Sequence, residues 1–389
     1  MFLAMTERRN PALVEAAIDL HRSGAVEPDT YVIDLDAVDH NAAALAAAGG
    51  RHGVELWFVA KQYGRNPLVT ATVAQHLPLA AAIDHREAGA LLGAGARLGN
   101  LGHLVQVPAR RLPRLLAAGP AYVTVADEQN LAAVAAAASA GGRGRVQPVL
   151  LKIRGAAEST FPGQDGGFEV SDVAGVLAFA AELGGVRIAG ATGFPCLSFD
   201  TAAGRPRPTG TLERVLAAAA TLRAAGLDPV LSLPSHTSVS TIPQIAALGG
   251  TVGEPGHSLT GTTPEHAVDA GLTERPALVY VSEIAQLGSA PSVFGGGFYS
   301  RGRARDLVVA TAGGVRRATL RDTPAGSIDY YRRFDWLGDG GGARVGDTAV
   351  MAFRTQIFVT RSRVAVVSGI GSGRPRLDGV FDALGGRVA

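Results

Sequence analysis

The sequence predicts a (β/α)8 barrel followed by an all-β domain, and two patterns in the chain support this fold class. In the first pattern, short apolar runs alternate with Ala- and Leu-rich helical stretches, which is typical of parallel βα units. Eight such units predict a closed barrel. The expected barrel strands are 56–60, 79–83, 103–107, 121–125, 148–153, 186–192, 229–233 and 251–253.

The second pattern begins after Pro264, where the helical stretches stop and Gly and Asp separate strand-like runs. This arrangement is typical of an all-β domain. The expected strands of this domain are 278–282, 307–311, 348–353, 356–360 and 364–368.

The segment before the barrel has its own signals. Asn10 and Pro11 suit the start of a helix, which we expect to end near Gly24. A strand at 31–35 and a helix at 36–48 follow. The predicted domains are an N-terminal helical extension (1–30), the barrel (31–272) and a C-terminal β-domain (273–389).

Composition excludes several classes of function. The 389 residues carry a net charge of +2 with no dense Lys/Arg run, which argues against binding to nucleic acid or a membrane surface. No signal peptide or membrane-spanning run is expected. The single cysteine, Cys196, can form no intrachain disulfide, and no metal-binding motif is present. These features predict a cytoplasmic protein whose partner is a small molecule.

Lysine is rare in this chain, because Lys61 and Lys152 are its only lysines and the other basic side chains are arginines. Lysine forms a Schiff base with a carbonyl, which arginine does not. Lys61 follows the first barrel strand, and the active sites of such barrels lie at the carboxyl ends of the strands. A solvated lysine at a strand end is the alternative for Lys61, and a barrel-lining charge is the alternative for Lys152.

Four motifs resemble those of one family: Lys61-Gln-Tyr-Gly-Arg-Asn-Pro67, Leu101-Gly-His-Leu-Val-Gln106, Phe161-Pro-Gly-Gln-Asp-Gly-Gly-Phe168 and Glu254-Pro-Gly-His-Ser-Leu-Thr-Gly261. Together they resemble the fold-type III pyridoxal-phosphate (PLP) enzymes of the alanine racemase family, and in particular an uncharacterised alanine-racemase-like subgroup. The resemblance implies PLP as cofactor on Lys61, an amino-acid substrate and a homodimer. It also implies that the strand at 31–35 joins the β-domain.

Two loops suit the phosphate of the cofactor. In such barrels the phosphate is usually bound by the loops after strands seven and eight. The first loop supplies small hydroxyls and the second supplies glycine. The candidate residues are Ser235, His236, Thr237, Ser238, Gly253 and Gly256, and by resemblance also Tyr63. Capping of the following helix is the alternative role for the hydroxyls.

Glu254 departs from alanine racemase, whose equivalent motif carries Arg against the pyridine nitrogen. A carboxylate there favours a protonated ring, which is a stronger electron sink. The basic-amino-acid decarboxylases of this fold share the Glu-Pro-Gly motif. By resemblance, Arg154 contacts the phenolic oxygen of the cofactor. His236 is a candidate to stack on the ring, and His103 and His257 are candidates for substrate contact.

Four reactions or roles remain open for this chain. Racemisation needs acid/base groups on both faces of the substrate, and the resemblance implies Lys61 on one face and a tyrosine of the second subunit on the other. We predict Tyr299 for that role, with Tyr280, Tyr330 and Tyr331 as alternatives. Decarboxylation is the second hypothesis, and non-catalytic PLP binding is the third. A barrel enzyme that uses a lysine Schiff base without PLP is the fourth.

Overall fold

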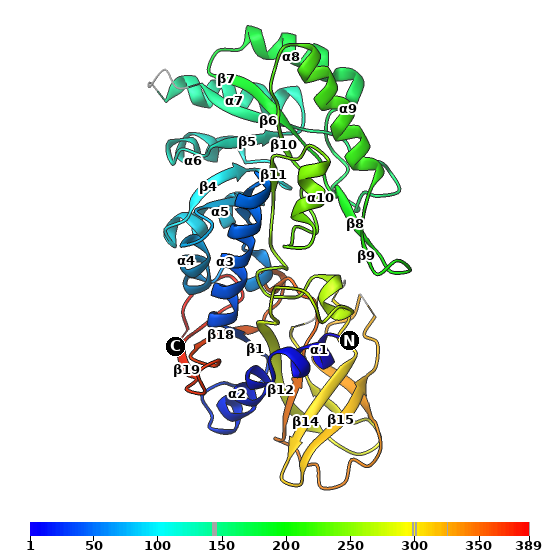
Figure 1. Cartoon of the computed structure of the whole chain (residues 1–389). Coiled ribbons are helices and arrows are strands. Elements are labelled where there is room, and N and C mark those ends of the chain that lie inside the picture. Colours follow the sequence, from blue (N-terminus) through cyan, green and yellow to red (C-terminus); the bar gives the residue numbers. More distant parts are fainter. Residues whose placement is uncertain (142–145, 298, 300–301, 325, 389) are drawn as a thin grey trace. The chain divides into compact units, whose positions relative to one another are not determined.

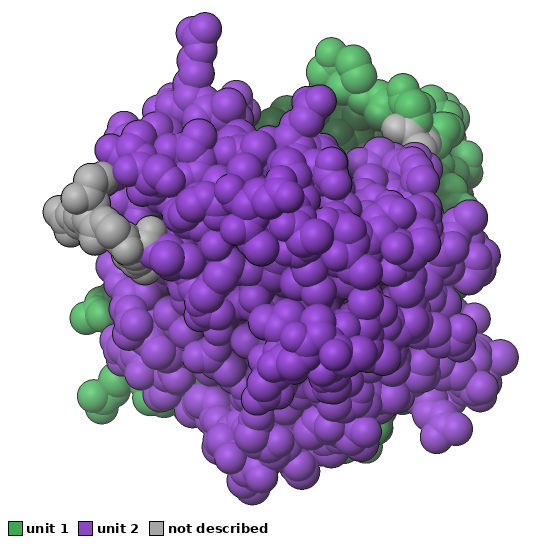
Figure 2. Space-filling view, turned by 90° about the horizontal axis from the view of Figure 1, so that it is seen from above, with its two compact units in different colours: residues 1–42, 61–72, 257–389 green, residues 43–60, 73–256 purple. Residues whose placement is uncertain are grey.

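The computed structural model describes residues 1–141, 146–297, 299, 302–324 and 326–388, and these form two compact units (Figures 1 and 2). Residues 43–60 and 73–256 make the barrel unit. Residues 1–42, 61–72 and 257–389 make the β unit. Because this division follows contacts between residues, it does not test where the predicted domains begin and end, and those boundaries stay predictions.

The barrel unit contains eight parallel strands that close on themselves in the order β10-β11-β2-β3-β4-β5-β6-β7. This closed barrel confirms the predicted fold class. Its strands are β2 (Glu55–Phe58), β3 (Leu79–Ala82), β4 (Arg97–Leu101), β5 (Tyr122–Val125), β6 (Gln147–Lys152), β7 (Val186–Thr192), β10 (Val230–Ser232) and β11 (Val252–Gly253).

The predicted third barrel strand is wrong, because residues 103–107 form a loop and β4 lies just before them. Two residues that are unusual in strands explain the error. A Cβ on Gly99 would lie 2.6 Å from the Trp57 ring, so glycine makes room for that indole. Asn100 is fully buried, and its side-chain oxygen accepts a hydrogen bond from Thr124 at 2.9 Å.

Helices follow most of the barrel strands and cover the outside of the barrel (Figure 1). Several begin at side-chain caps: Asp84 accepts hydrogen bonds from two backbone N–H groups of α5, and Thr209 caps α9. The helices that lie wholly or partly in this unit are α3 (Leu35–His52), α4 (Pro67–Ala74), α5 (His85–Gly93), α6 (Leu112–Ala117), α7 (Glu128–Ala140), α8 (Val173–Glu182), α9 (Gly210–Ala224) and α10 (Ile242–Ala247). A hairpin, β8 (Leu197–Asp200) and β9 (Arg205–Pro208), precedes α9.

The β unit is built on a nine-stranded sheet in the order β13-β16-β15-β14-β17-β12-β1-β18-β19. The first strand of the chain, β1, pairs antiparallel with β12 and parallel with β18, so it lies inside this sheet. The strands are β1 (Thr30–Asp34), β12 (Leu278–Gln286), β13 (Ser292–Phe294), β14 (Asp306–Thr311), β15 (Gly314–Leu320), β16 (Tyr331–Trp336), β17 (Thr348–Met351), β18 (Arg363–Ser368) and β19 (Arg376–Phe381).

Two helices pack on this sheet. The helix α2 (Pro11–Arg22) presents Leu13 and Val14 to a core that includes Val279 and Val281 of β12. The preceding helix, α1 (Phe2–Arg9), was not predicted, because Thr6 to Arg9 interrupts its apolar residues. Only Leu3 and Thr6 of α1 are buried.

The predicted strand at 356–360 is also wrong. Its centre, Ile357–Val359, is a short 3-10 helix. Ile357 is fully buried, and the ring of Phe358 lies 5.2 Å below the guanidinium of Arg65. The apolar alternation of this segment therefore reflects packing on residues near Gly64 and not pairing with another strand.

No helix in the described part of the chain is both long enough and apolar enough to span a membrane.

Closure of the barrel depends on a close approach at Gly190 in β7. A Cβ at this position would lie 1.9 Å from the carbonyl oxygen of Val230 in β10. We expect Gly190→Ala to lower the free energy of unfolding by about 3 kcal/mol, because backbone must move to relieve the overlap. Urea unfolding of the purified chain measures this.

Gly89 provides the matched control. It is exposed in α5, and a Cβ there would meet nothing within 4 Å. Gly89→Ala should raise the unfolding free energy by about 0.5–1 kcal/mol through helix propensity. Equal effects of the two substitutions would contradict this account of barrel closure.

Candidate active site

Lys61 lies three residues after Phe58, the carboxyl end of β2. The strand is extended past its last paired residue, because Val59 N–H donates to the Pro255 carbonyl at 2.9 Å. The next backbone N–H, of Ala60, donates to the Glu87 carboxylate at 3.1 Å. The Lys61 side chain is 9% exposed, which excludes the alternative of a fully solvated lysine.

The Lys61 motif continues as a tight turn. Lys61–Tyr63 forms a 3-10 turn, and Gly64 and Arg65 both have left-handed backbone conformations, with φ of 69° and 54°. The Tyr63 side chain is fully buried, with its hydroxyl 3.4 Å from that of Thr70. The predicted role of Tyr63 at the phosphate stays a prediction. Asn66 begins the next helix, since its side-chain oxygen accepts hydrogen bonds from two backbone N–H groups.

Glu254 lies directly after β11, and its carboxylate is almost completely buried, with 1% of the side chain exposed. The hydroxyl of Ser232, the last residue of β10, donates to Oε1 at 2.7 Å. Nε2 of His103 lies 3.1 Å from Oε2. The backbone N–H of Glu254 donates to the Thr237 hydroxyl at 2.9 Å. The structure thus joins two predicted residues, Thr237 and Glu254, and adds Ser232, which the sequence analysis missed.

The loop after β10 has a constrained backbone. Ser235 and His236 have φ of 91° and 52°, a left-handed conformation that costs free energy outside glycine and is often found at functional sites. The Ser235 hydroxyl donates to the Leu197 carbonyl at 2.6 Å. The Ser238 N–H donates to the Thr241 hydroxyl at 2.9 Å. These bonds hold the loop in its conformation.

The His236 ring is stacked on Phe199, with the ring centroids 6.3 Å apart and the planes at 19°. Its predicted role at the cofactor ring stays a prediction. Gly253 lies against this loop: a Cβ there would be 2.8 Å from Cγ2 of Thr237. Gly256 is buried in the same Glu-Pro-Gly turn. Glycine at 253 therefore leaves room that any other residue would fill.

Arg154 has partners that the sequence analysis did not predict. Its guanidinium forms an ion pair with Glu169 at 3.0 Å and is about half exposed. Its predicted contact with a cofactor oxygen stays a prediction. Lys152, two residues earlier, donates from Nζ to the Gln164 carbonyl at 3.1 Å, and burial lowers its pKa.

Cys196, the single cysteine of the chain, is a free and buried thiol. Its Sγ lies 3.3 Å from the Gly193 carbonyl. Burial, together with the negative charge of Glu254, raises the pKa of Cys196. The thiol is therefore held in its unreactive, protonated form. In the described part of the chain, no group of three or more His, Cys, Asp or Glu side chains is placed to hold a metal ion.

Tyr299 belongs to the β unit, where it is 7% exposed and its carbonyl accepts a hydrogen bond from Gly302 N–H at 2.8 Å. The glycines before it are tightly held. The Gly297 carbonyl accepts from the Tyr31 hydroxyl at 2.5 Å, and Gly296 N–H donates to Asp329 at 2.8 Å. The role of Tyr299 as an acid/base group stays a prediction.

Asp29 lies against these glycines, since a Cβ on Gly296 would overlap its carboxylate. Tyr280 donates to Asp29 Oδ1 at 2.8 Å, and the Ser362 hydroxyl donates to the same oxygen. Burial raises the pKa of Asp29 to about 6, and the two hydrogen bonds only partly oppose this shift. Tyr280, an alternative to Tyr299 in the sequence analysis, is thus occupied in holding Asp29.

Comparison with known proteins shows that two segments of the chain match two domain families. Residues 33–264 match the family described as alanine racemase, N-terminal domain, and residues 279–377 match YhfX-like, C-terminal domain. The chain is 37% identical over 390 residues to the uncharacterised protein YhfX of Escherichia coli (strain K12), with 99% of each chain covered.

Solved structures show the same fold at low sequence identity. Alanine racemase from Clostridium difficile 630 in complex with cycloserine has a TM-score of 0.64 at 16% identity, covering 92% of this chain and 99% of its own. Diaminopimelate decarboxylase from Helicobacter pylori complexed with L-lysine has a TM-score of 0.66 at 13% identity, covering 94% and 95%.

Asp29 makes stability depend on pH. Its pKa is raised from the ordinary aspartate value of 3.8 to about 6 in the folded chain, so the folded chain binds the proton more tightly. This contribution is complete below pH 3.8 and is lost as the pH rises through 6. In the unmodified chain, this titration should lower the free energy of unfolding by about 1–2 kcal/mol between pH 4 and 7. The variant Asp29→Asn should lack this pH dependence. Urea unfolding at several pH values measures it.

The exposed Asp19 of α2 is the control, and Asp19→Asn should keep the pH dependence of the unmodified chain. A variant of Asp29 with the original pH dependence would show that this carboxyl does not titrate in that range.

Proposed function

The chain belongs to the alanine racemase family, and we propose that it is a PLP-dependent enzyme that breaks a bond at the α-carbon of an amino acid, with Lys61 as the cofactor-binding residue. Members of this family use PLP. Three facts about Lys61 support the proposal: it follows a barrel strand, its side chain is buried, and it is one of two lysines in the chain. Active sites of such barrels lie at this end of the strands.

The single observation that carries the proposal is the buried carboxylate of Glu254, held by Ser232 and near His103. Burying a charged carboxylate costs free energy. A chain that retains one at a strand end therefore indicates a functional role for it. The residues present fit the cofactor: Glu254 suits the ring nitrogen, and Gly253 with the 235–238 loop leaves room for a phosphate. When bound, PLP supplies a ring that accepts the electron pair left at the α-carbon.

Each residue then has a defined task. The Lys61 amine would hold the cofactor, and it would hold or move a proton on one face of the substrate. Glu254 keeps a proton on the ring nitrogen. The two glycines, 253 and 256, and the loop after β10 bind the phosphate through backbone N–H groups.

Racemisation is the first candidate reaction. It requires a second acid/base group on the face opposite Lys61. We assign that role to Tyr299 of a second copy of the chain, which makes a homodimer part of the proposal. The bonds that hold Gly296 and Gly297 support it, because they restrict the segment just before Tyr299.

Decarboxylation of an amino acid is the second candidate, and Glu254 favours it. A carboxylate beside the ring nitrogen strengthens the electron sink that loss of CO2 requires. Non-catalytic PLP binding is the weaker alternative, because it gives no role to the held segment before Tyr299. A cytoplasmic location remains a prediction from the single, buried cysteine.

The cofactor assignment is tested by absorbance and mass spectrometry. We expect the purified chain, supplied with PLP, to absorb in the visible range and to carry the pyridoxyl group on Lys61 after borohydride reduction. Lys61→Ala should lose both signals. Lys152→Met is the control, since it should leave the adduct on Lys61. An adduct on Lys152, or no absorbance with added PLP, would overturn the assignment.

The reaction is tested with a panel of amino acids, by chiral analysis and by CO2 release. Racemisation predicts incorporation of solvent deuterium at the α-carbon of both enantiomers. Tyr299→Phe should slow this reaction by roughly 10²–10⁴-fold, the usual contribution of an acid/base group. It should leave cofactor absorbance unchanged. CO2 release with retained activity in Tyr299→Phe would instead favour decarboxylation.

A further inference from the structure

His103 reaches Glu254 from the far side of the barrel. It follows β4, whereas Glu254 follows β11, and β2 and β3 lie between these strands in the barrel order. The contact between His103 Nε2 and Glu254 Oε2, at 3.1 Å, therefore spans the barrel opening and does not run along its wall. Both side chains are almost completely buried, with 4% and 1% exposed.

The loop that carries His103 is anchored on both sides. Gly102 turns the chain in a left-handed conformation, with φ of 83°. Val105 N–H donates to the Ile83 carbonyl after β3 at 3.0 Å. On the other side, the Gln106 side chain donates to the Thr124 carbonyl of β5 at 3.2 Å. The backbone at His103 is thus held before the side chain makes any contact.

The plane of the His103 ring is also defined. The rings of His103 and Phe194 pack edge to face, with their centroids 5.9 Å apart and their planes at 88°. This packing directs the ring without using its nitrogens, so Nε2 stays directed at Glu254. A histidine that only filled space would need no such alignment with a carboxylate.

The carboxylate of Glu254 is consequently contacted by two side chains, and its backbone by a third. Ser232 donates to Oε1, His103 approaches Oε2, and Thr237 accepts from the backbone N–H. Ser232 is a neutral donor, whereas the imidazole of His103 can also carry the positive charge that a buried carboxylate favours.

We propose that His103 is a positioning residue for Glu254: it keeps this carboxylate charged and correctly oriented, and so determines how firmly Glu254 holds a proton on the ring nitrogen of PLP. The role towards PLP rests on the proposed function. Without the imidazole close to Oε2, the buried carboxyl would take up a proton itself, and the ring would lose its charged partner.

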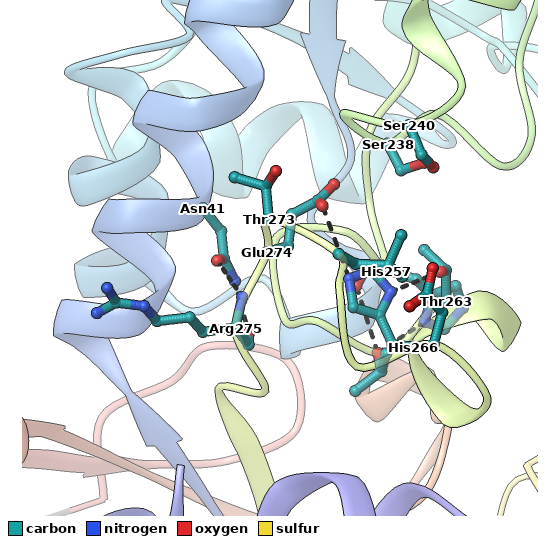
Figure 3. Close-up of polar contacts among 12 residues, drawn as sticks. Asn41, Ser238, Ser240, His257, Thr263, His266, Thr273, Glu274 and Arg275 are labelled. Carbon is teal, nitrogen blue, oxygen red and sulfur yellow. Dashed lines mark hydrogen bonds and ion pairs between the residues drawn. The ribbon is translucent and has the colours of Figure 1, made fainter. Parts of the chain in front are cut away.

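A second buried pair offers a matched control. In the β unit, His266 and Glu274 are both fully buried, with His266 Nε2 3.8 Å from the carboxylate (Figure 3). The other ring nitrogen of His266 lies 2.6 Å from the Thr263 hydroxyl. This pair shares the chemistry and the burial of His103 and Glu254, but no role in PLP binding is proposed for it.

The first experiment measures PLP binding by absorbance titration of the full chain. His103→Met should weaken PLP binding roughly 10–100-fold, the effect of losing one polar contact with a charged group, and should shift the visible band of the bound cofactor. His103→Gln, whose amide can still donate, should restore most of both. His266→Gln should leave both unchanged. Equal effects of the Met and Gln variants, or of the control, would overturn the inference.

The second experiment needs no cofactor. In the cofactor-free full chain labelled with ¹⁵N-histidine, Glu254→Gln should change the ring-nitrogen signals of His103, identified by their loss in His103→Gln. The signals of His266 should stay unchanged. If PLP binds but these His103 signals do not respond, this inference alone is wrong. If they respond but PLP does not bind, the proposed function is wrong, and the role towards the ring falls with it.

Discussion

Closure of the parallel sheet between β7 and β10 is the constraint on which the candidate site depends. In a closed parallel barrel, all strands end at the same rim, so residues far apart in sequence meet there. His103 and Glu254 come from different parts of the chain and still lie 3.1 Å apart. The closed rim brings polar groups to face one another across an opening, whereas an open parallel sheet would leave them spread along one edge. The chemistry of the site is thus a consequence of the geometry of the sheet.

Periodicity predicted the barrel because most of its strands are short apolar runs bounded by turns. The strand Arg97–Leu101 was not predicted, because Gly99 and Asn100 are unusual in strands. Gly99 makes room for the Trp57 indole, and Asn100 accepts a buried hydrogen bond. The segment Ile357–Val359 was wrongly predicted as a strand for the opposite reason. Its residues are apolar, but they form a 3-10 helix and pair with no other strand among the described residues. The pattern of apolar residues in the sequence predicts which residues are buried, but it does not predict which other segment they pack against.

The candidate site shows the same division. Lys61 and Glu254 could be predicted because their residue types are chemically distinctive at strand ends, and because the motifs around them resemble a known family. The link from His103 to Glu254 could not be predicted, since it depends on which rim positions face each other across the opening. The partners of Arg154 were missed for a similar reason, because Glu169 lies on a loop with no regular pattern.

The position of β1 has a further consequence for handling this protein. A fragment that begins at residue 273 would lack β1, which separates β12 from β18 in the sheet. Both strands would then expose a full row of unpaired backbone N–H and C=O groups and the apolar face of Val279 and Val281. Exposed edges of this kind recruit other chains. We therefore expect the carboxy-terminal third of the sequence to aggregate when it is expressed alone, so it is not a domain that can be studied in isolation.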